Sequence, residues 1–147
     1  MDNDEVLASL DQLIHTCRDG DEDFRACAEQ AGDTRLKAFF SNRAQTCASA
    51  AVELEDMLRA RGGDPIAAGD SPQRHRLDLK PAADGRGKDK ALLDECERSE
   101  DAALAHYRRV LEKSLPADIR STVERQYQGA LKNHDEVKSL RDQYRGG

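Results

Sequence analysis

Apolar residues recur at three- and four-residue steps along four stretches of the chain, and charged residues fill most positions between them. This spacing places the apolar side chains on one face of an α-helix, which completes a turn in about 3.6 residues. The pattern predicts amphipathic helices at about residues 4–31, 34–61, 89–113 and 116–144. An Asp-Gly-Asp sequence around Gly20 interrupts the first stripe, so we expect one long helix there that can kink at this glycine.

Residues that favour helix ends lie between the predicted helices. Gly32 ends the first helix, and Asp33 or Thr34 can cap the second by accepting hydrogen bonds from its free N–H groups. A double glycine then ends the second helix, because glycine readily adopts the left-handed conformation that closes a helix. The following stretch, residues 62–88, holds three of the four prolines and little periodicity. We therefore expect a long connection rather than a fifth helix.

The lengths of the connections predict how the helices pack. Short links force the first and second helices, and likewise the third and fourth, to run antiparallel. The long crossover can span the length of a helix, so the second and third helices can run parallel. Two antiparallel hairpins joined by one long crossover predict an all-α, ferritin-like four-helix bundle. At 147 residues the chain has the size of a single domain, which we expect to cover residues 1–147.

Charge is distributed unevenly along the chain, whose formal net charge is −6. Residues 1–31 hold nine acidic and two basic residues, which makes the first helix the acidic face and the candidate surface for a protein partner. The net negative charge argues against nucleic-acid binding, which requires a basic patch. No apolar run approaches the roughly 20 residues of a membrane span. We therefore expect a cytoplasmic protein without membrane contact, as a monomer or a small homo-oligomer.

Acidic residues also occur within the apolar stripe of the third helix. The sequence ECERSEDAALAHY places Glu97 and Glu100 among apolar positions, and antiparallel pairing brings His134 of the fourth helix within one turn of both. Glu53 of the second helix can assist. Carboxylate and imidazole ligands suit iron, manganese or zinc. However, the sequence contains no Glu-x-x-His, the motif that di-iron bundles supply from two helices, so a metal site would need an altered ligand set.

Other reactive side chains give weaker signals. Four cysteines occur without a Cys-x-x-Cys pair, and they are most simply interpreted as small buried apolar residues. Folding the first hairpin about Gly32 sets Cys17 opposite Cys47, which makes them candidate facing thiols with a redox role. In the crossover, His75 and Arg76 could contact an anion or an acidic neighbour, but a solvated loop surface is the simpler interpretation.

Several segments together resemble a known family. They are DQLIHTCRDGDEDFRACAE, LEDMLRARGGDP and the Cys-Glu-Arg-x-Glu-Asp motif at residues 96–101. Across nearly the whole chain the sequence is similar to the bacterial ferritin-like four-helix-bundle family of unknown function. This resemblance implies a compact bacterial bundle without an assigned enzyme activity, and it implies no catalytic mechanism.

Two functions follow from these observations. The first is a non-catalytic bundle with a structural, interaction or stress-associated role, in which Glu97, Glu100 and His134 form a polar network with Arg43 or Gln126. The alternative is a metal-binding bundle that uses the same acids and imidazole as ligands. The sequence favours the first function and leaves enzymatic activity without a candidate catalytic residue.

Overall fold

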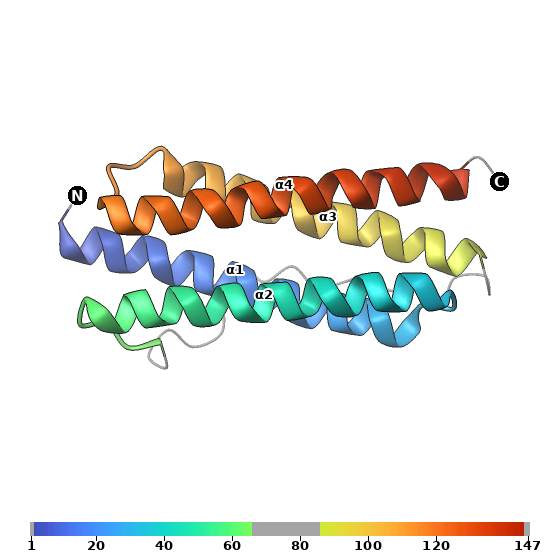
Figure 1. Cartoon of the computed structure of the whole chain (residues 1–147), viewed down its shortest axis with the longest axis horizontal. Coiled ribbons are helices and arrows are strands. Elements are labelled where there is room, and N and C mark those ends of the chain that lie inside the picture. Colours follow the sequence, from blue (N-terminus) through green and yellow to red (C-terminus); the bar gives the residue numbers. More distant parts are fainter. Residues whose placement is uncertain (1, 66–85, 146–147) are drawn as a thin grey trace.

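The structure, a computed structural model, describes residues 2–65 and 86–145, with the side chains of residues 86 and 145 left aside. Four long helices form a bundle (Figure 1). They are α1 (Asn3–Gln30), α2 (Thr34–Ala60), α3 (Arg86–Leu111) and α4 (Ala117–Arg145). Within these ranges no helix is long and apolar enough to cross a membrane.

The helices form two antiparallel hairpins, α1 with α2 and α3 with α4. The hairpins meet mainly where α1 packs against α3. Helices α2 and α3 run in the same direction, so that Ala60 and Arg86 lie at opposite ends of the bundle (Figure 1). This arrangement confirms the predicted all-α bundle with parallel second and third helices.

The ends of α2 are set by the predicted local signals. The Asp33 carboxylate accepts hydrogen bonds from the backbone N–H groups of Arg35 and Leu36, at 2.7 and 3.3 Å. These bonds satisfy two donors that a helix start leaves free. At the other end Gly62 has a φ of 88°, in the left-handed region that favours glycine. The double glycine therefore closes the helix as the sequence indicated.

Helix α3 begins at Arg86, three residues before the predicted start near Asp89. Asp89 lies instead within the first helical turn and is buried. Its two carboxylate oxygens accept hydrogen bonds from the backbone N–H groups of Gly32 and Asp33, at 2.8 and 3.1 Å. This aspartate thus ties the α1–α2 turn to the start of α3 and joins the two hairpins.

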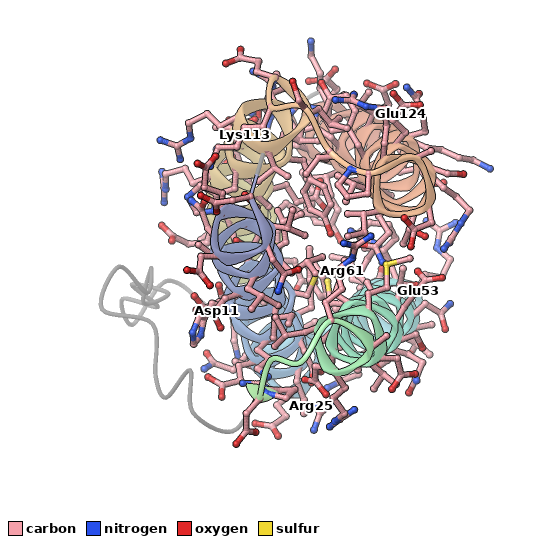
Figure 2. The ribbon with its side chains drawn as sticks, turned by 90° about the vertical axis from the view of Figure 1, so that its left-hand side faces the viewer. Asp11, Arg25, Glu53, Arg61, Lys113 and Glu124 are labelled. Atoms are coloured by element: carbon pink, nitrogen blue, oxygen red, sulfur yellow. The ribbon has the colours of Figure 1, made fainter. Side chains whose placement is uncertain are left out.

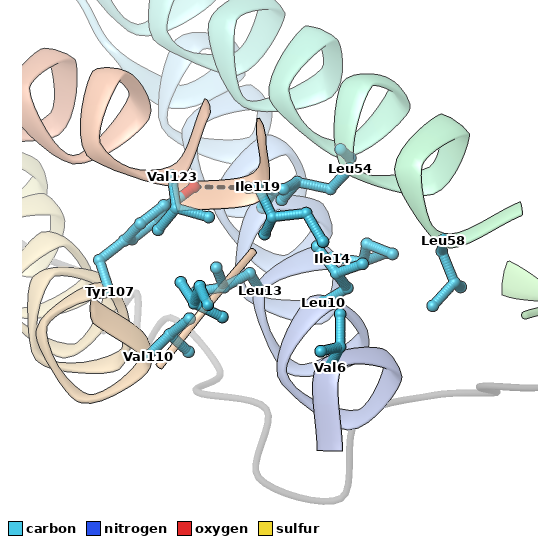
Figure 3. Close-up of a cluster of buried hydrophobic side chains, with 13 residues drawn as sticks. Val6, Leu10, Leu13, Ile14, Leu54, Leu58, Tyr107, Val110, Ile119 and Val123 are labelled. Atoms are coloured by element: carbon cyan, nitrogen blue, oxygen red, sulfur yellow. Dashed lines mark hydrogen bonds between the residues drawn. The ribbon is translucent and has the colours of Figure 1, made fainter. Parts of the chain in front are cut away.

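The buried apolar residues divide into two clusters along the bundle axis. The first cluster lies beside the start of α1 and the end of α2, and Figure 3 shows most of its members. It contains Val6, Leu10, Leu13, Ile14, Cys17, Ala51, Leu54, Leu58, Tyr107, Val110, Leu115, Ile119 and Val123. The second cluster contains Phe24, Cys27, Ala31, Leu36, Phe40, Ala44, Leu92, Leu93, Cys96 and Val137. Polar side chains and small residues occupy the level between these clusters on every helix.

Candidate functional site

A cavity of about 480 Å³ lies at this middle level, and all four helices contribute to its walls. Small residues create the space, because each helix places one at the cavity wall: Gly20, Ala50, Ala103 and Ala130. Large apolar side chains would fill the same level in a close-packed bundle. The volume falls within the roughly 300–1,000 Å³ of small-molecule sites. This cavity is therefore the candidate functional site of the bundle.

A chain of hydrogen bonds crosses the cavity and touches all four helices. The Tyr107 hydroxyl donates to Gln126 Oε1 at 2.8 Å, so it accepts from the Cys17 thiol at 3.1 Å. Gln126 Nε2 in turn donates to Glu53 Oε1 at 2.8 Å. Glu53 also pairs with Arg125, and this hydrogen bond is the main cause that lowers the pKa of Glu53. Glu53 thus lies on the side of α2 that faces α4 (Figure 2).

A buried ion pair forms a second polar feature of the cavity wall. Arg43 Nε of α2 lies 3.5 Å from Glu100 Oε1 of α3, and both residues are buried. The Arg43 guanidinium also lies 5.2 Å from the centre of the Phe24 ring, in a cation–π contact. Among the described residues, neither Glu100 oxygen has a hydrogen-bond partner. Burial raises the pKa of Glu100 to about 7, although Arg43 and His134 oppose this change.

The predicted metal ligands are only partly brought together. His134 Nε2 lies 2.7 Å from Asp101 Oδ1, and Glu97 pairs with Arg141. Ligand atoms of Glu97, Asp101 and His134 lie within 4.8 Å of one another. Asp101 takes the place predicted for Glu100, since residues four apart share a helix face more closely than residues three apart. Among the described residues Glu100 is not part of this group, because its carboxylate faces Arg43 in the interior.

Glu53 is also absent from this group, because it bonds to Arg125 and Gln126 at the cavity. The predicted contact residues of the crossover, His75 and Arg76, lie outside the described residues. A di-iron centre would need carboxylates and histidines from all four helices at the middle level. The described lining has carboxylates from α1, α2 and α3 and one histidine, His106, but α4 supplies neither an acid nor a histidine to it, and two arginines lie among the carboxylates. The residues at the cavity therefore do not fit a di-iron site.

The predicted thiols Cys17 and Cys47 both line the cavity, but each has a different neighbour. Cys17 bonds to the Tyr107 hydroxyl, as described above. The Cys47 sulfur packs against α1, 2.9 Å from where a side chain at Gly20 would begin. Burial raises the pKa of Cys17 to about 12 and that of Cys47 to about 11, so both thiols stay protonated at neutral pH.

The two thiols in contact are Cys27 of α1 and Cys96 of α3, whose sulfur atoms lie 3.3 Å apart. Both are buried in the second cluster, and burial is the main cause that raises the pKa of Cys96 well above its ordinary value. Sequence reasoning missed this pair. Both cysteines lie on the predicted apolar stripes. However, counting residues about a turn pairs only the two helices of one hairpin, and α1 and α3 belong to different hairpins.

Comparison with known proteins identifies a family and a fold. The family model described as "Domain of unknown function (DUF2383)" matches residues 5–113. A solved structure described as "ferritin like, diiron-carboxylate proteins from Bacillus anthracis str. Ames" superposes with a TM-score of 0.69. The two chains are 17% identical, and the match covers 98% of this chain and 99% of the other, which confirms the predicted ferritin-like fold. None of the curated proteins shows significant sequence similarity to this chain.

Proposed function

The chain belongs to the DUF2383 family, and we propose that it acts as a non-catalytic structural or interaction bundle without a di-iron centre. One observation carries this proposal: three carboxylates that face neighbouring helices each pair with an arginine of another helix. The pairs are Glu100 with Arg43, Glu97 with Arg141, and Glu53 with Arg125. A buried carboxylate such as Glu100 requires a countercharge, which Arg43 provides, whereas Glu97 and Glu53 pair with their arginines at partly exposed positions.

These pairs support a structural role because each one joins two helices. Arg43 connects α2 to α3, Arg141 connects α4 to α3, and Arg125 connects α4 to α2. Charge pairs that match across helices disfavour other packing arrangements, since a misplaced helix would leave an uncompensated charge. For the interaction role, the exposed acids of α1 are the proposed contact surface for a protein partner.

Metal analysis tests the proposal. Protein purified without chelator or affinity tag would be analysed for metals, then titrated anaerobically with Fe(II), Mn(II) and Zn(II). Glu100→Ala would be compared with Glu95→Ala, a buried glutamate of the same helix that does not line the cavity. We expect no stoichiometric metal that depends on Glu100. Stoichiometric metal in the wild type that is lost in Glu100→Ala alone would refute the proposal.

A metal site with an altered ligand set is the second candidate function. It is favoured by the convergence of Glu97, Asp101 and His134, whose ligand atoms lie within 4.8 Å of one another. Two acids and an imidazole suit zinc, manganese or iron, although Arg141 would have to release Glu97. In the same titrations, this function predicts that His134→Ala loses the metal and Glu100→Ala keeps it. His106→Ala is the matched control, because His106 bonds to Thr16 away from this group.

A further inference from the structure

Two thiols that belong neither to the ion pairs nor to the cavity lining lie in contact in the core. Cys27 of α1 and Cys96 of α3 are 0% and 1% exposed, and their sulfur atoms lie 3.3 Å apart. A disulfide bond is about 2.0 Å long, so the two sulfur atoms would have to approach by about 1.3 Å to form one. Cys17 contacts the Tyr107 hydroxyl instead, and Cys27 with Cys96 is the one thiol pair in contact within the described ranges.

Polar contacts on both sides of this thiol pair fix how α1 packs against α3. Nearer the cavity, Ser99 Oγ of α3 donates a hydrogen bond to Asp23 Oδ2 of α1 at 3.1 Å. Asp23 and Ser99 each lie about one helical turn from the cysteine of their own helix. Toward the α1–α2 turn, the Asp89 carboxylate accepts the two backbone hydrogen bonds described above. The thiols therefore lie between two anchored levels and meet without any shift of the helices.

The cavity gives a small reagent access to the neighbourhood of the pair. Phe24 and Glu100 line the cavity, and they lie three residues from Cys27 and four residues from Cys96. Along a helix these separations correspond to roughly 4.5 and 6 Å. A molecule close to water in size, such as hydrogen peroxide, can occupy the cavity. A peptide disulfide such as oxidised glutathione is too large to follow it into the close-packed core.

We propose that Cys27 and Cys96 form a reversible disulfide when the folded protein meets hydrogen peroxide, and that this bond locks the two hairpins together. One thiol loses its proton, and its sulfur attacks a peroxide oxygen. The O–O bond breaks, which leaves a sulfenic acid and one water. The second sulfur then displaces the sulfenic hydroxyl, which leaves with the second thiol proton as another water. Two electrons thus pass from the two thiols to the peroxide.

The disulfide would join the hairpins at their main contact. The hairpins meet chiefly where α1 packs against α3, and the two cysteines are 69 positions apart in the chain. Closing so long a segment removes conformations from the unfolded chain and therefore stabilises the fold. Burial raises the pKa of Cys96 well above its ordinary value, so little thiolate is present at neutral pH and sustained peroxide is needed. This site goes beyond the proposed structural role, whose ion pairs do not respond to oxidants.

Peptide mapping locates the bond without any substitution. Native protein would be treated with hydrogen peroxide, alkylated with iodoacetamide in urea and digested with trypsin, which leaves the four cysteines in four separate peptides. We expect residues 26–35 and 91–98 to appear as one linked species that reduction separates, with a matching loss of both peptides in alkylated form. Oxidised glutathione should not produce this link in the native protein. Peroxide added to the chain in urea should produce no preference for this pair.

Urea denaturation tests whether the bond locks the bundle. The oxidised wild type should unfold at a higher urea concentration than the reduced protein, and dithiothreitol should reverse the shift. Cys27→Ala should abolish the shift, whereas Cys47→Ala, at a half-buried cysteine of the cavity wall, should retain it. The mapping uses the wild type alone, so it stays decisive if Cys27→Ala fails to fold. The proposal is overturned if peroxide leaves residues 26–35 and 91–98 unlinked, if other cysteine pairs link equally, or if the linked protein is no more stable than the reduced one.

Discussion

Replacing Glu100 by glutamine should make the stability of the bundle less dependent on pH. Burial raises the pKa of this carboxyl from its ordinary 4.5 to about 7 in the folded protein. Between these values the folded chain keeps a proton that the unfolded chain has released. The stability that Glu100 contributes is therefore fully present below 4.5 and is lost as the pH rises through about 7.

The size of this loss follows from the interval between the two pKa values. Each pH unit within it lowers the free energy of unfolding by about 1.4 kcal/mol, so the whole interval costs the wild type about 3 kcal/mol. Glutamine does not titrate and avoids this loss. It also lacks a charge beside Arg43, but the titration already includes that difference, because the attraction of Arg43 is one of the causes that set the pKa of Glu100. Differences in packing and hydrogen bonding between the neutral carboxyl and the amide do not depend on pH, so they cancel when each protein is compared with itself at two pH values.

Urea denaturation followed by circular dichroism, at about pH 5 and about pH 8, measures this difference. Between these conditions the wild type should lose about 2.5 kcal/mol more stability than Glu100→Gln, because pH 5 to 8 covers most but not all of the interval. Glu112→Gln makes the same chemical change at an exposed position and serves as the control. If the wild type and Glu100→Gln lose equal stability, Glu100 does not titrate as a buried group and the reasoning fails.

Two further predictions concern a glycine and the thiols. Gly63→Ala should destabilise the fold by about 1–3 kcal/mol in urea denaturation, because its new Cβ would lie 2.7 Å from Leu58 Cγ, whereas Gly129→Ala meets open space and should stabilise α4 by up to about 1 kcal/mol. Equal effects of the two substitutions would contradict the packing. In native protein treated with iodoacetamide, the half-buried Cys47 should be alkylated before the three fully buried cysteines. Mass spectrometry after proteolysis gives the order, and uniform alkylation would refute it.

The helices could be predicted because their signals are local. Apolar spacing defined the four amphipathic faces, Asp33 capped the start of α2, and Gly62 closed its end, as their chemistry indicated. The start of α3 was predicted three residues too late. Asp89 has the character of a helix-capping residue in the sequence, but its carboxylate binds the distant N–H groups of Gly32 and Asp33. A contact between residues so far apart in the chain leaves no periodic signal.

The sequence predicted where the site residues lie along the bundle axis, but not which way their side chains point around each helix. Counting residues about the α3–α4 turn correctly brought Glu97 near His134. The count gives position along the axis, whereas the direction of a side chain around the helix decides its partner. Asp101 therefore shares the α4-facing side, and Glu100 turns toward Arg43. The cavity was not predicted either, because small residues reveal a space only when all four helices are assembled.

The arginine pairs and the cavity are two consequences of the same choice of countercharge. A bundle that neutralises inward acids with metal ions draws its carboxylates toward the axis, because ligand atoms must converge on the ion. An arginine has a long side chain, so its guanidinium can reach a carboxylate on a neighbouring helix while its own backbone stays in place. Arg125 does so from an exposed position, and Arg43 from a place against Phe24. The acids can then stay at the walls, because each meets its countercharge there and none has to converge on a shared ion.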